Sequence, residues 1–366
     1  MSEQPIVFEE RPAGDGRIGV ARLTMPRALN ALSMGMIDQL GPQLSRWAAD
    51  EAIKAVWLEG EGDKAFCAGG DVIALYRDMT EPRPSGQESY GERFFRVEYE
   101  LDYQLHRYPK PVICWGHGIV MGGGMGLMAG ASHRVVTEGS RLAMPEVSIG
   151  LYPDVGAGWF LNRMPGRCGI FLGLTGAHMN AADALFVGLA DRFIRHQEKS
   201  AVIRALAAAD WSAASAHSTV SQVLRQAERG SFPALPDSPV REHFDTIQSL
   251  TDADTATDVV ANIQAYAGDS RWVRKAAASL SSASPTSMAI IWRHLQVSRM
   301  ASLAEVLANE RVLSVQCLRK GEFAEGIRAL LIDKDQQPRW RYPSLEEVDP
   351  TWIDDFFAGQ SDGATD

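Results

Sequence analysis

The sequence lacks several features that would place it in a specialised class of protein. No apolar run reaches the roughly 18 residues that a membrane-spanning helix needs. The four cysteines, Cys67, Cys114, Cys168 and Cys317, lack the spacing of a disulfide framework or a zinc site. No basic run interrupts a net charge of −10, which argues against nucleic acid or an anionic membrane as a partner. What remains is a 366-residue chain, 45% hydrophobic, that can bury a large core.

The N-terminal residues also lack a targeting pattern. The segment MSEQPIVFEERPAG has acids where a secretory signal needs a basic start and an apolar run, and it lacks the Arg/Ser bias of a transit peptide. Scattered, unpaired cysteines are typical of a reducing compartment. We therefore expect a cytoplasmic protein.

Short β-like runs alternate with helical patterns over the first 200 residues. IGVARLTM (18–25), IKAVWLEGEG (53–62) and KPVICWGHGIV (110–120) predict strands, while SMGMIDQLGPQLSRWAAD predicts an amphipathic helix capped by Ser33. GGGMGLMAGAS predicts a helix of small residues. This alternation predicts an α/β core.

The amino-acid composition changes after about residue 195. Alanine, leucine, arginine and glutamate dominate, in patterns that predict helices. We therefore divide the chain into a core, residues 1–200, and a mainly helical C-terminal region, residues 201–366. Within the latter, 205–255 is rich in Ser, Pro and Asp and reads as a linker or an insertion, and the order of 197–284 stays open.

Two glycine-rich turns each follow a predicted strand and precede a predicted helix. They are GEGDKAFCAGGD (60–71) and GHGIVMGGGMG (116–126), and neither has the spacing of a phosphate-binding Walker loop. Glycines leave backbone N–H groups uncovered, and the first turn of a helix has N–H groups without intrahelical partners. Two such turns brought together would stabilise an oxyanion. The alternative is that the glycines only allow close packing of the backbone.

These turns, with two further segments, carry a family resemblance. AFCAGGD, GHGIVMGGGMGL, AMPEVSIGLYPDVGAGWFL and EFAEGIRALLIDKDQQPRW follow one another in an order similar to that of the crotonase (enoyl-CoA hydratase/isomerase) superfamily. The resemblance covers about residues 15–190 and 285–345. It implies an α/β crotonase (ClpP/crotonase-like) fold of repeated β-β-α units with a helical C-terminal extension, and an acyl-CoA substrate. By the matching motifs, the oxyanion donors are the N–H groups of Gly70 and Gly123.

The resemblance also assigns the acids. Crotonase-type hydratases use two glutamates, and this sequence has Gly126 at the position of the first, while Glu146 matches the second. Asp154 follows eight residues later, as in a hydrolase branch that cleaves short 3-hydroxyacyl-CoA thioesters such as 3-hydroxyisobutyryl-CoA in valine breakdown. Glu146 would act as general base or as nucleophile. Asp154 would orient the substrate hydroxyl, position Glu146 or transfer a proton, and the sequence does not separate these roles.

Each assignment has a plainer alternative. Asp154 has the sequence position of a helix N-cap, and Glu146 that of a solvated strand end. Glu98 matches a substrate-contacting acid of the hydrolase branch, although Glu98 and Glu100 also fit the surface of an amphipathic helix. Arg27 is the candidate cation for the nucleotide end of coenzyme A.

Two residues near the glycine turns have structural interpretations. His117 has no Ser or Cys beside it in a triad pattern, so we expect a structural role. Cys67 reads as a small buried residue.

The favoured function is therefore a thioesterase that needs neither a metal nor a redox cofactor, since coenzyme A is part of the substrate. Crotonase relatives often form homo-oligomers, so oligomerisation is an open expectation. Two alternatives remain: an enoyl-CoA hydratase or isomerase that uses Glu146 alone or with Glu98, and a non-catalytic acyl-CoA-binding protein.

Overall fold

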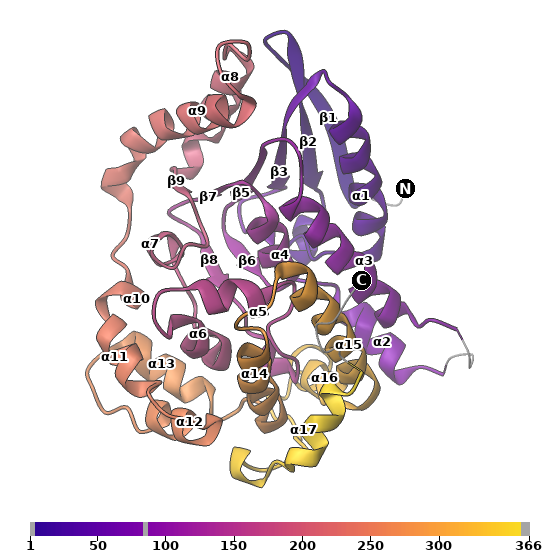
Figure 1. Ribbon diagram of the computed structural model, residues 1–366, viewed down its shortest axis with the longest axis vertical. Helices are drawn as coiled ribbons and strands as arrows, with labels where there is room; N and C mark the ends of the chain where they lie inside the picture. Colours follow the sequence, from indigo (N-terminus) through magenta and orange to yellow (C-terminus); the bar gives the residue numbers. More distant parts are fainter. Residues whose placement is uncertain (1–3, 83–86, 360–366) are drawn as a thin grey trace. The chain divides into compact units, whose positions relative to one another are not determined.

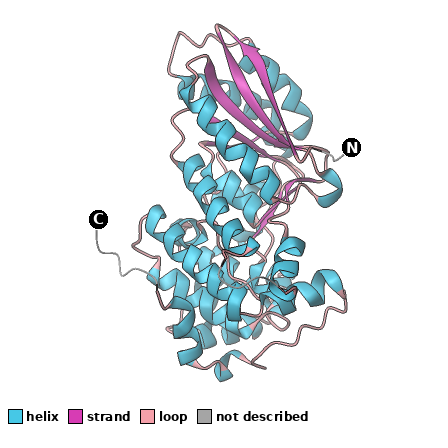
Figure 2. Cartoon of the chain, turned by 90° about the vertical axis from the view of Figure 1, so that its right-hand side faces the viewer, coloured by secondary structure: helices cyan, strands magenta, loops and turns pink. Residues whose placement is uncertain are grey.

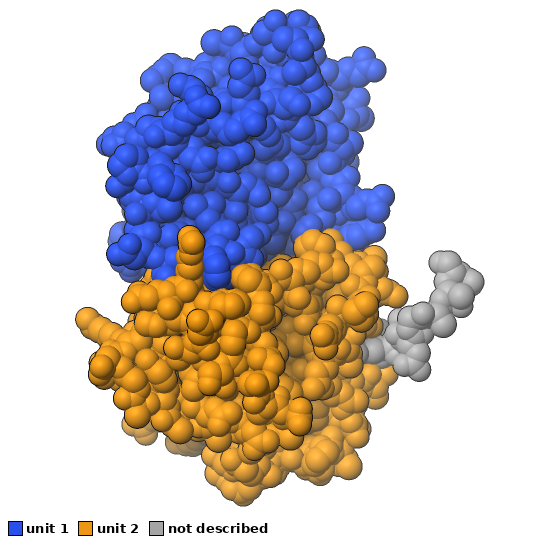
Figure 3. Space-filling view, turned by 60° about the vertical axis from the view of Figure 1, so that its left-hand side comes forward, with its two compact units in different colours: residues 1–70, 100–142, 179–238 blue, residues 71–99, 143–178, 239–366 orange. Residues whose placement is uncertain are grey.

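The computed structural model describes residues 4–82 and 87–359, which belong to two compact units (Figure 3). The first unit comprises residues 1–70, 100–142 and 179–238, and the second comprises 71–99, 143–178 and 239–366. The chain thus passes between the units after residues 70, 99, 142, 178 and 238, whereas its composition predicts a single division, after residue 200. The division into an acyl-CoA-binding core and a helical region stays a prediction about function.

The strands form two sheets (Figures 1 and 2). The larger sheet has the order β1-β2-β3-β5-β7-β9, and the smaller has the order β4-β6-β8. β1 and β2 are antiparallel, and the successive pairs from β2 to β9 are parallel. The strands are β1 (Ile6–Ala13), β2 (Gly16–Leu23), β3 (Ile53–Gly60), β4 (Ala65–Cys67), β5 (Val112–Gly116), β6 (Ile119–Met121), β7 (His133–Val136), β8 (Arg141–Ala143) and β9 (Arg192–Phe193).

The first unit also contains helices, some between the strands and two after the last strand. They are α1 (Met34–Ala49), α4 (Gly123–Gly130), α7 (Ala181–Phe186), α8 (Lys199–Ala207) and α9 (Ala216–Ser231), and α3 (Tyr90–His106) begins in the second unit and ends in the first. The predicted cap of α1 is confirmed, because the Ser33 side chain accepts a hydrogen bond from the Met36 N–H. The predicted strands correspond to β2, β3 and β5, and the predicted small-residue helix is α4, whereas β6 lies inside the segment predicted as a glycine-rich turn.

The larger sheet is covered on both faces. Neighbouring residues of a strand point to opposite faces, and β2 shows this division. A Cβ on Gly19 would lie 2.6 Å from the Trp47 ring of α1, so α1 packs closely on that face. Ile18 and Val20 lie in a buried cluster with Val202 of α8. That second cluster, which also holds residues of α9, is the core of the first unit.

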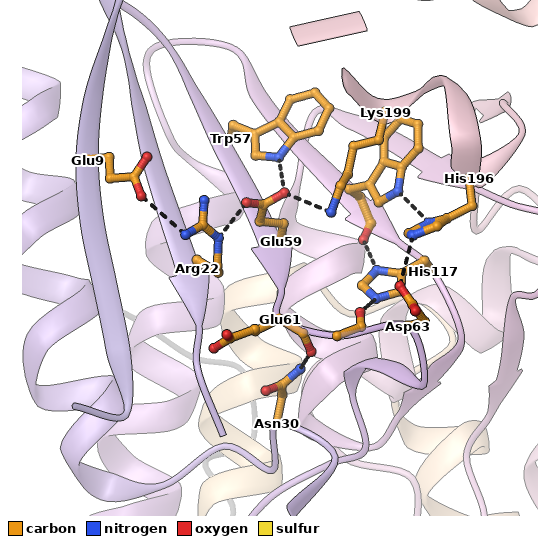
Figure 4. A network of polar contacts seen from close by, with 12 residues as sticks. Glu9, Arg22, Asn30, Trp57, Glu59, Glu61, Asp63, His117, His196 and Lys199 are labelled. Atoms are coloured by element: carbon orange, nitrogen blue, oxygen red, sulfur yellow. Dashed lines mark hydrogen bonds and ion pairs between the residues drawn. The ribbon is translucent and has the colours of Figure 1, made fainter. Parts of the chain in front are cut away.

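A buried carboxylate ties α8 to the sheet (Figure 4). Glu59 of β3 accepts hydrogen bonds from the Arg22 Nε at 2.7 Å and the Trp57 Nε1 at 3.1 Å, and the Lys199 Nζ lies 3.2 Å away. Burial raises the pKa of Glu59, but the charges of Lys199 and Arg22 and the hydrogen bonds outweigh burial, so the pKa lies below its ordinary value. Glu59 is therefore ionised and forms an ion pair with Lys199, the first residue of α8, which attaches this helix to the sheet.

His117 lies in the same region of the first unit (Figure 4). Its Nε2 is 2.7 Å from the carbonyl oxygen of Gly62, and its ring centroid is 4.7 Å from that of His196. The side chain is buried, which agrees with the structural role expected for it. Cys67 is buried as well.

The described residues of the second unit are mainly helical. The helices, besides the start of α3, are α2 (Val72–Thr80), α5 (Ala157–Phe160), α6 (Cys168–Thr175), α10 (Pro239–Glu242), α11 (Phe244–Leu250), α12 (Ala256–Gln264), α13 (Arg271–Ser279), α14 (Pro285–Val297), α15 (Leu303–Lys320), α16 (Phe323–Ile327) and α17 (Pro350–Phe357). The region 197–284, whose order the sequence left open, is thus largely helical in the two units. None of the helices in the described ranges has the length and apolar character needed to cross a bilayer.

Candidate active site

Glu146 opens a single turn of 3-10 helix, Glu146–Ile149, that follows β8. Its side chain is only 5% exposed, so the alternative of a solvated strand end is wrong. Among the described residues, Oε2 of Glu146 has no hydrogen-bond partner. Burial, and then the charge of Asp154, raise the pKa of Glu146 well above its ordinary value. A buried carboxyl oxygen without a hydrogen-bond partner destabilises the folded state, and such groups are common in active sites. Glu146 is therefore a candidate catalytic residue.

Asp154 lies in the loop between this 3-10 turn and α5. It is also 5% exposed, and its Oδ2 accepts a hydrogen bond of 2.6 Å from the Tyr99 hydroxyl. The N-cap alternative is wrong, because the cap residue of α5 is Gly156 and no side chain caps that helix. Burial raises the pKa of Asp154 to about 7, although the Tyr99 hydrogen bond lowers it and the Glu310 charge raises it further.

The two acids form an electrostatically linked pair within the second unit. Each has a raised pKa, and the charge of Asp154 contributes to the shift of Glu146. Because each ionised carboxylate disfavours ionisation of the other, the two groups are expected to lose their protons in separate, coupled steps. A pair of this kind supplies both a base and an acid, which a hydrolytic reaction needs.

The sequence did not predict a group of buried polar residues that lies next to Asp154. Tyr99 also lies 2.7 Å from the Ser314 hydroxyl, which is 2.8 Å from the Tyr152 hydroxyl. Glu310 is fully buried and accepts hydrogen bonds from the N–H groups of Gly156 and Gly158. The available signal was a polar interruption of an apolar helix face, because Glu310 and Ser314 are four residues apart in α15.

In the first unit, the two glycine turns lie against each other. β4 pairs with β6, and a Cβ on Gly69 would lie 3.5 Å from the Met121 carbonyl oxygen. A Cβ on Gly124 would lie 2.2 Å from the Cys67 carbonyl oxygen, so a side chain there would clash with backbone. The close-packing interpretation is therefore correct for Gly124, whereas Gly69 has an ordinary contact and a positive φ of +111° that favours glycine. Both observations are compatible with a second role for the N–H groups of these glycines.

The two predicted oxyanion donors sit at these turns. Gly123 is the first residue of α4, a position whose N–H has no acceptor within the helix. Gly70 forms an isolated parallel bridge with Leu32, next to the point where the Gly69 carbonyl oxygen accepts a hydrogen bond of 2.7 Å from the Leu32 N–H. The role of both glycines as donors to an oxyanion stays a prediction.

The remaining candidate residues differ in burial. Glu98 is 2% exposed and Glu100 is exposed, so the surface-charge alternative is wrong for Glu98 alone. Arg27 is exposed, in a 3-10 turn at Pro26–Ala28. Gly126, at the position of the first hydratase glutamate, is buried inside α4. In the part of the chain that the structure describes, no group of three or more His, Cys, Asp or Glu is placed to hold a metal ion.

Comparison with known proteins places this chain in a family. The model of the family described as enoyl-CoA hydratase/isomerase matches residues 18–357. The "3-hydroxyisobutyryl-CoA hydrolase, mitochondrial" of Xenopus tropicalis is 39% identical over 95% of this chain and 88% of its own. The human protein of the same name is 37% identical over the same shares.

Solved structures confirm the predicted crotonase-type α/β fold. An enoyl-CoA hydratase from Rhodobacter sphaeroides 2.4.1 is 34% identical, covers 97% of both chains and has a TM-score of 0.81. A carnitinyl-CoA dehydratase from Mycobacterium thermoresistibile is 32% identical over 97% of both chains, with a TM-score of 0.82.

One expectation from the sequence is overturned by these comparisons. The N-terminal residues and the cysteines predict a cytoplasmic protein, whereas the curated relatives carry "mitochondrial" in their names. The prediction of location was wrong because it rested on the absence of a targeting pattern, which is weak information. The family assignment rests on stronger observations, namely the match over residues 18–357 and the identity of 34–39% to these relatives. The chain belongs to the enoyl-CoA hydratase/isomerase family.

Proposed function

We propose that this protein is a thioesterase that hydrolyses 3-hydroxyisobutyryl-CoA to 3-hydroxyisobutyrate and coenzyme A, as a step of valine breakdown. The observation that carries the proposal is the buried pair of Glu146 and Asp154, with an unpartnered oxygen on Glu146. Gly126 supports it, because a hydratase of this family needs a second glutamate where this chain has no side chain. The names of the curated relatives point the same way.

In the proposed reaction, the thioester carbonyl oxygen accepts hydrogen bonds from the N–H groups of Gly70 and Gly123. These glycines belong to the first unit, and the acids belong to the second. The donors would stabilise the negative charge that develops on the carbonyl oxygen, and removal of one such donor costs about 3 kcal/mol of transition-state stabilisation.

Glu146 acts on the thioester in one of two ways. Either it removes a proton from the attacking water, or its carboxylate attacks the carbonyl carbon and water then opens the mixed anhydride. In both routes the C–S bond breaks and the leaving thiolate needs a proton. Asp154, whose pKa is raised to about 7, is a suitable donor of that proton near neutral pH.

The rest of the site completes the proposal. Glu98 would contact the acyl part of the substrate, and Arg27 would contact the phosphates of coenzyme A. No step requires a metal or a redox cofactor. Association into a homo-oligomer belongs to the same proposal, and light scattering coupled to size-exclusion chromatography tests it.

The test of the function is release of free thiol from 3-hydroxyisobutyryl-CoA. The same assay is run with 3-hydroxypropionyl-CoA, and loss of crotonyl-CoA absorbance is followed in parallel. We expect thiol release from the 3-hydroxyacyl thioesters and a stable crotonyl-CoA signal. Loss of crotonyl absorbance without thiol would instead identify a hydratase, and silence in all three assays would favour a binding protein.

A further inference from the structure

The turn that carries Asp154 has a strained backbone. Val155 has a φ of +52° and Gly156 a φ of +86°, both in the left-handed region. That region is costly for a β-branched residue, on the order of 1–2 kcal/mol. A turn of this kind persists only if its surroundings hold it, so the contacts that hold it also determine where Asp154 points.

Glu310 of α15 makes those contacts. Its Oε2 accepts a hydrogen bond of 2.6 Å from the Gly156 N–H, and its Oε1 accepts one of 3.0 Å from the Gly158 N–H. The His294 Nε2 lies 3.0 Å from the same Oε1. Glu310 is 0% exposed and His294 is 1% exposed, so no solvent competes for these bonds. One carboxylate thus fixes the backbone immediately after Asp154.

A second set of contacts fixes the Asp154 carboxyl itself. The Tyr99 hydroxyl donates to Asp154 Oδ2, and Ser314 lies within hydrogen-bond distance of both Tyr99 and Tyr152. The Tyr152 hydroxyl in turn donates to the backbone carbonyl oxygen of Glu310 at 2.8 Å. The two sets therefore meet in α15, which holds Asp154 by its backbone and by its side chain.

We infer that Glu310, braced by His294, is a positioning residue that holds the strained Asp154 turn, with Ser314 and Tyr99 as its partners at the carboxyl. The inference deepens the proposed function and rests on it, because it gives a role to residues behind the acid pair. Glu310 does not touch the substrate in this scheme. It acts through the direction and the acidity of Asp154, where a displacement of about 1 Å can cost about 100-fold in rate.

The test is the substitution Glu310→Gln, with Glu305→Gln as the matched control. Both changes remove one carboxylate from α15, but Glu305 lies at the exposed start of the helix, in a capping box that also tolerates Gln. We expect kcat for thiol release to fall about 10- to 100-fold in Glu310→Gln, with KM nearly unchanged, and the control to match the wild type.

The pH profile separates positioning from general damage to the fold. The titratable groups that interact with Asp154, among the described residues, are Tyr99 of α3, Glu146 of the 3-10 turn, Tyr152 of the following loop, and Glu310 and Cys317 of α15. The Glu310 charge raises the pKa of Asp154, so Glu310→Gln should move the Asp154 limb of the profile to lower pH. The Tyr99 hydrogen bond lowers that pKa, so Tyr99→Phe should move the limb to higher pH.

A measurement without substrate keeps the two proposals apart. Hydrogen exchange of the segment 152–160 should be faster in Glu310→Gln than in the wild type, because the amide of Gln has one acceptor oxygen and leaves one of the two N–H groups, of Gly156 or Gly158, without its acceptor. If the wild type cleaves no thioester but hydrogen exchange accelerates as expected, the proposed function is wrong, while the positioning role of Glu310 is supported. Unchanged exchange, or an unchanged kcat and pH limb in an active protein, overturns the inference.

A milder variant covers the case in which Glu310→Gln does not fold. Ser314→Ala removes one hydroxyl between Tyr99 and Tyr152. It leaves the hydrogen bonds between Glu310 and the turn after Asp154 in place. We expect a fall in kcat of about 3- to 10-fold with a shifted Asp154 limb, in line with the loss of one buried hydrogen-bonding group. Wild-type kinetics and pH dependence in Ser314→Ala would then overturn the inference.

Discussion

At the scale of single residues, the account rests on carboxyl groups that the fold keeps away from water. Glu146 has an oxygen without a partner among the described residues, while Asp154 receives the Tyr99 hydroxyl. The sequence identified both acids through their family motifs. It did not identify Tyr99, because no local pattern around a tyrosine in an amphipathic helix predicts a hydrogen bond to a residue 55 positions away.

The raised pKa of Asp154 predicts a specific dependence of stability on pH. Its ordinary value is 3.8 and its value in the folded chain is about 7. Between these two values the folded chain keeps a proton that the unfolded chain has lost. The stability from this group is therefore fully present below about pH 4 and is lost as the pH rises through 7.

The substitution Asp154→Asn removes this dependence and keeps an acceptor for Tyr99. Relative to the variant, the wild type should lose free energy of unfolding by up to about 1.4 kcal/mol per pH unit between pH 4 and 7. Urea unfolding of both proteins at several pH values in this window measures the difference. Parallel curves for the two proteins would show that the carboxyl is ionised throughout the range.

At the scale of elements, local signals predict where helices and strands occur better than which of them form one unit. The Ser33 cap and the strands β2, β3 and β5 of the larger sheet follow from their own residues. The Ser-, Pro- and Asp-rich region 205–255, which the sequence left open as a linker or an insertion of uncertain order, contains helices. There Ser215 accepts from the N–H of Ser218, and just beyond it Thr255 accepts from Asp258 and Ser270 from Val273. These polar residues mark the starts of helices.

The attachment of α8 to the sheet gives a prediction at this scale. Lys199→Met removes one cation from the buried carboxylate of Glu59 and leaves Arg22 and Trp57 in place. Because an ion pair to a buried carboxylate is lost, the free energy of unfolding should fall by about 1–3 kcal/mol in urea denaturation. Lys275→Met, at an exposed lysine without a partner among the described residues, is the control and should change stability by less than about 0.5 kcal/mol. Equal effects of the two substitutions would contradict the anchoring role of Glu59.

At the scale of the whole molecule, the organisation into units could not be predicted from the sequence. Composition changes once along the chain, near residue 195, whereas each compact unit is assembled from separate segments. Contacts such as Tyr99 with Ser314 join residues 215 positions apart, and no local pattern announces them. The fold family was nevertheless predictable, because its motifs lie at the glycine turns and the acids.

The interleaved units predict the behaviour of a fragment. A chain of residues 1–200 keeps the strands but lacks α9, whose Val220 and Leu224 belong to the buried cluster with Trp57 and Trp115. Because that apolar surface would be exposed, we expect the fragment to lack fixed tertiary structure, with weak near-ultraviolet circular dichroism and strong binding of a hydrophobic dye. A cooperative unfolding transition of the fragment would contradict the division into units.

Thiol release by the wild type and by Glu146→Gln, with binding of the thioester to both proteins measured by calorimetry, decides whether Glu146 carries out the reaction. We expect the wild type to release coenzyme A from 3-hydroxyisobutyryl-CoA. We also expect a variant that binds the thioester with similar affinity but turns it over at least about 10³-fold more slowly, since base or nucleophile is lost. Full activity in Glu146→Gln would remove this residue from the reaction and contradict the account.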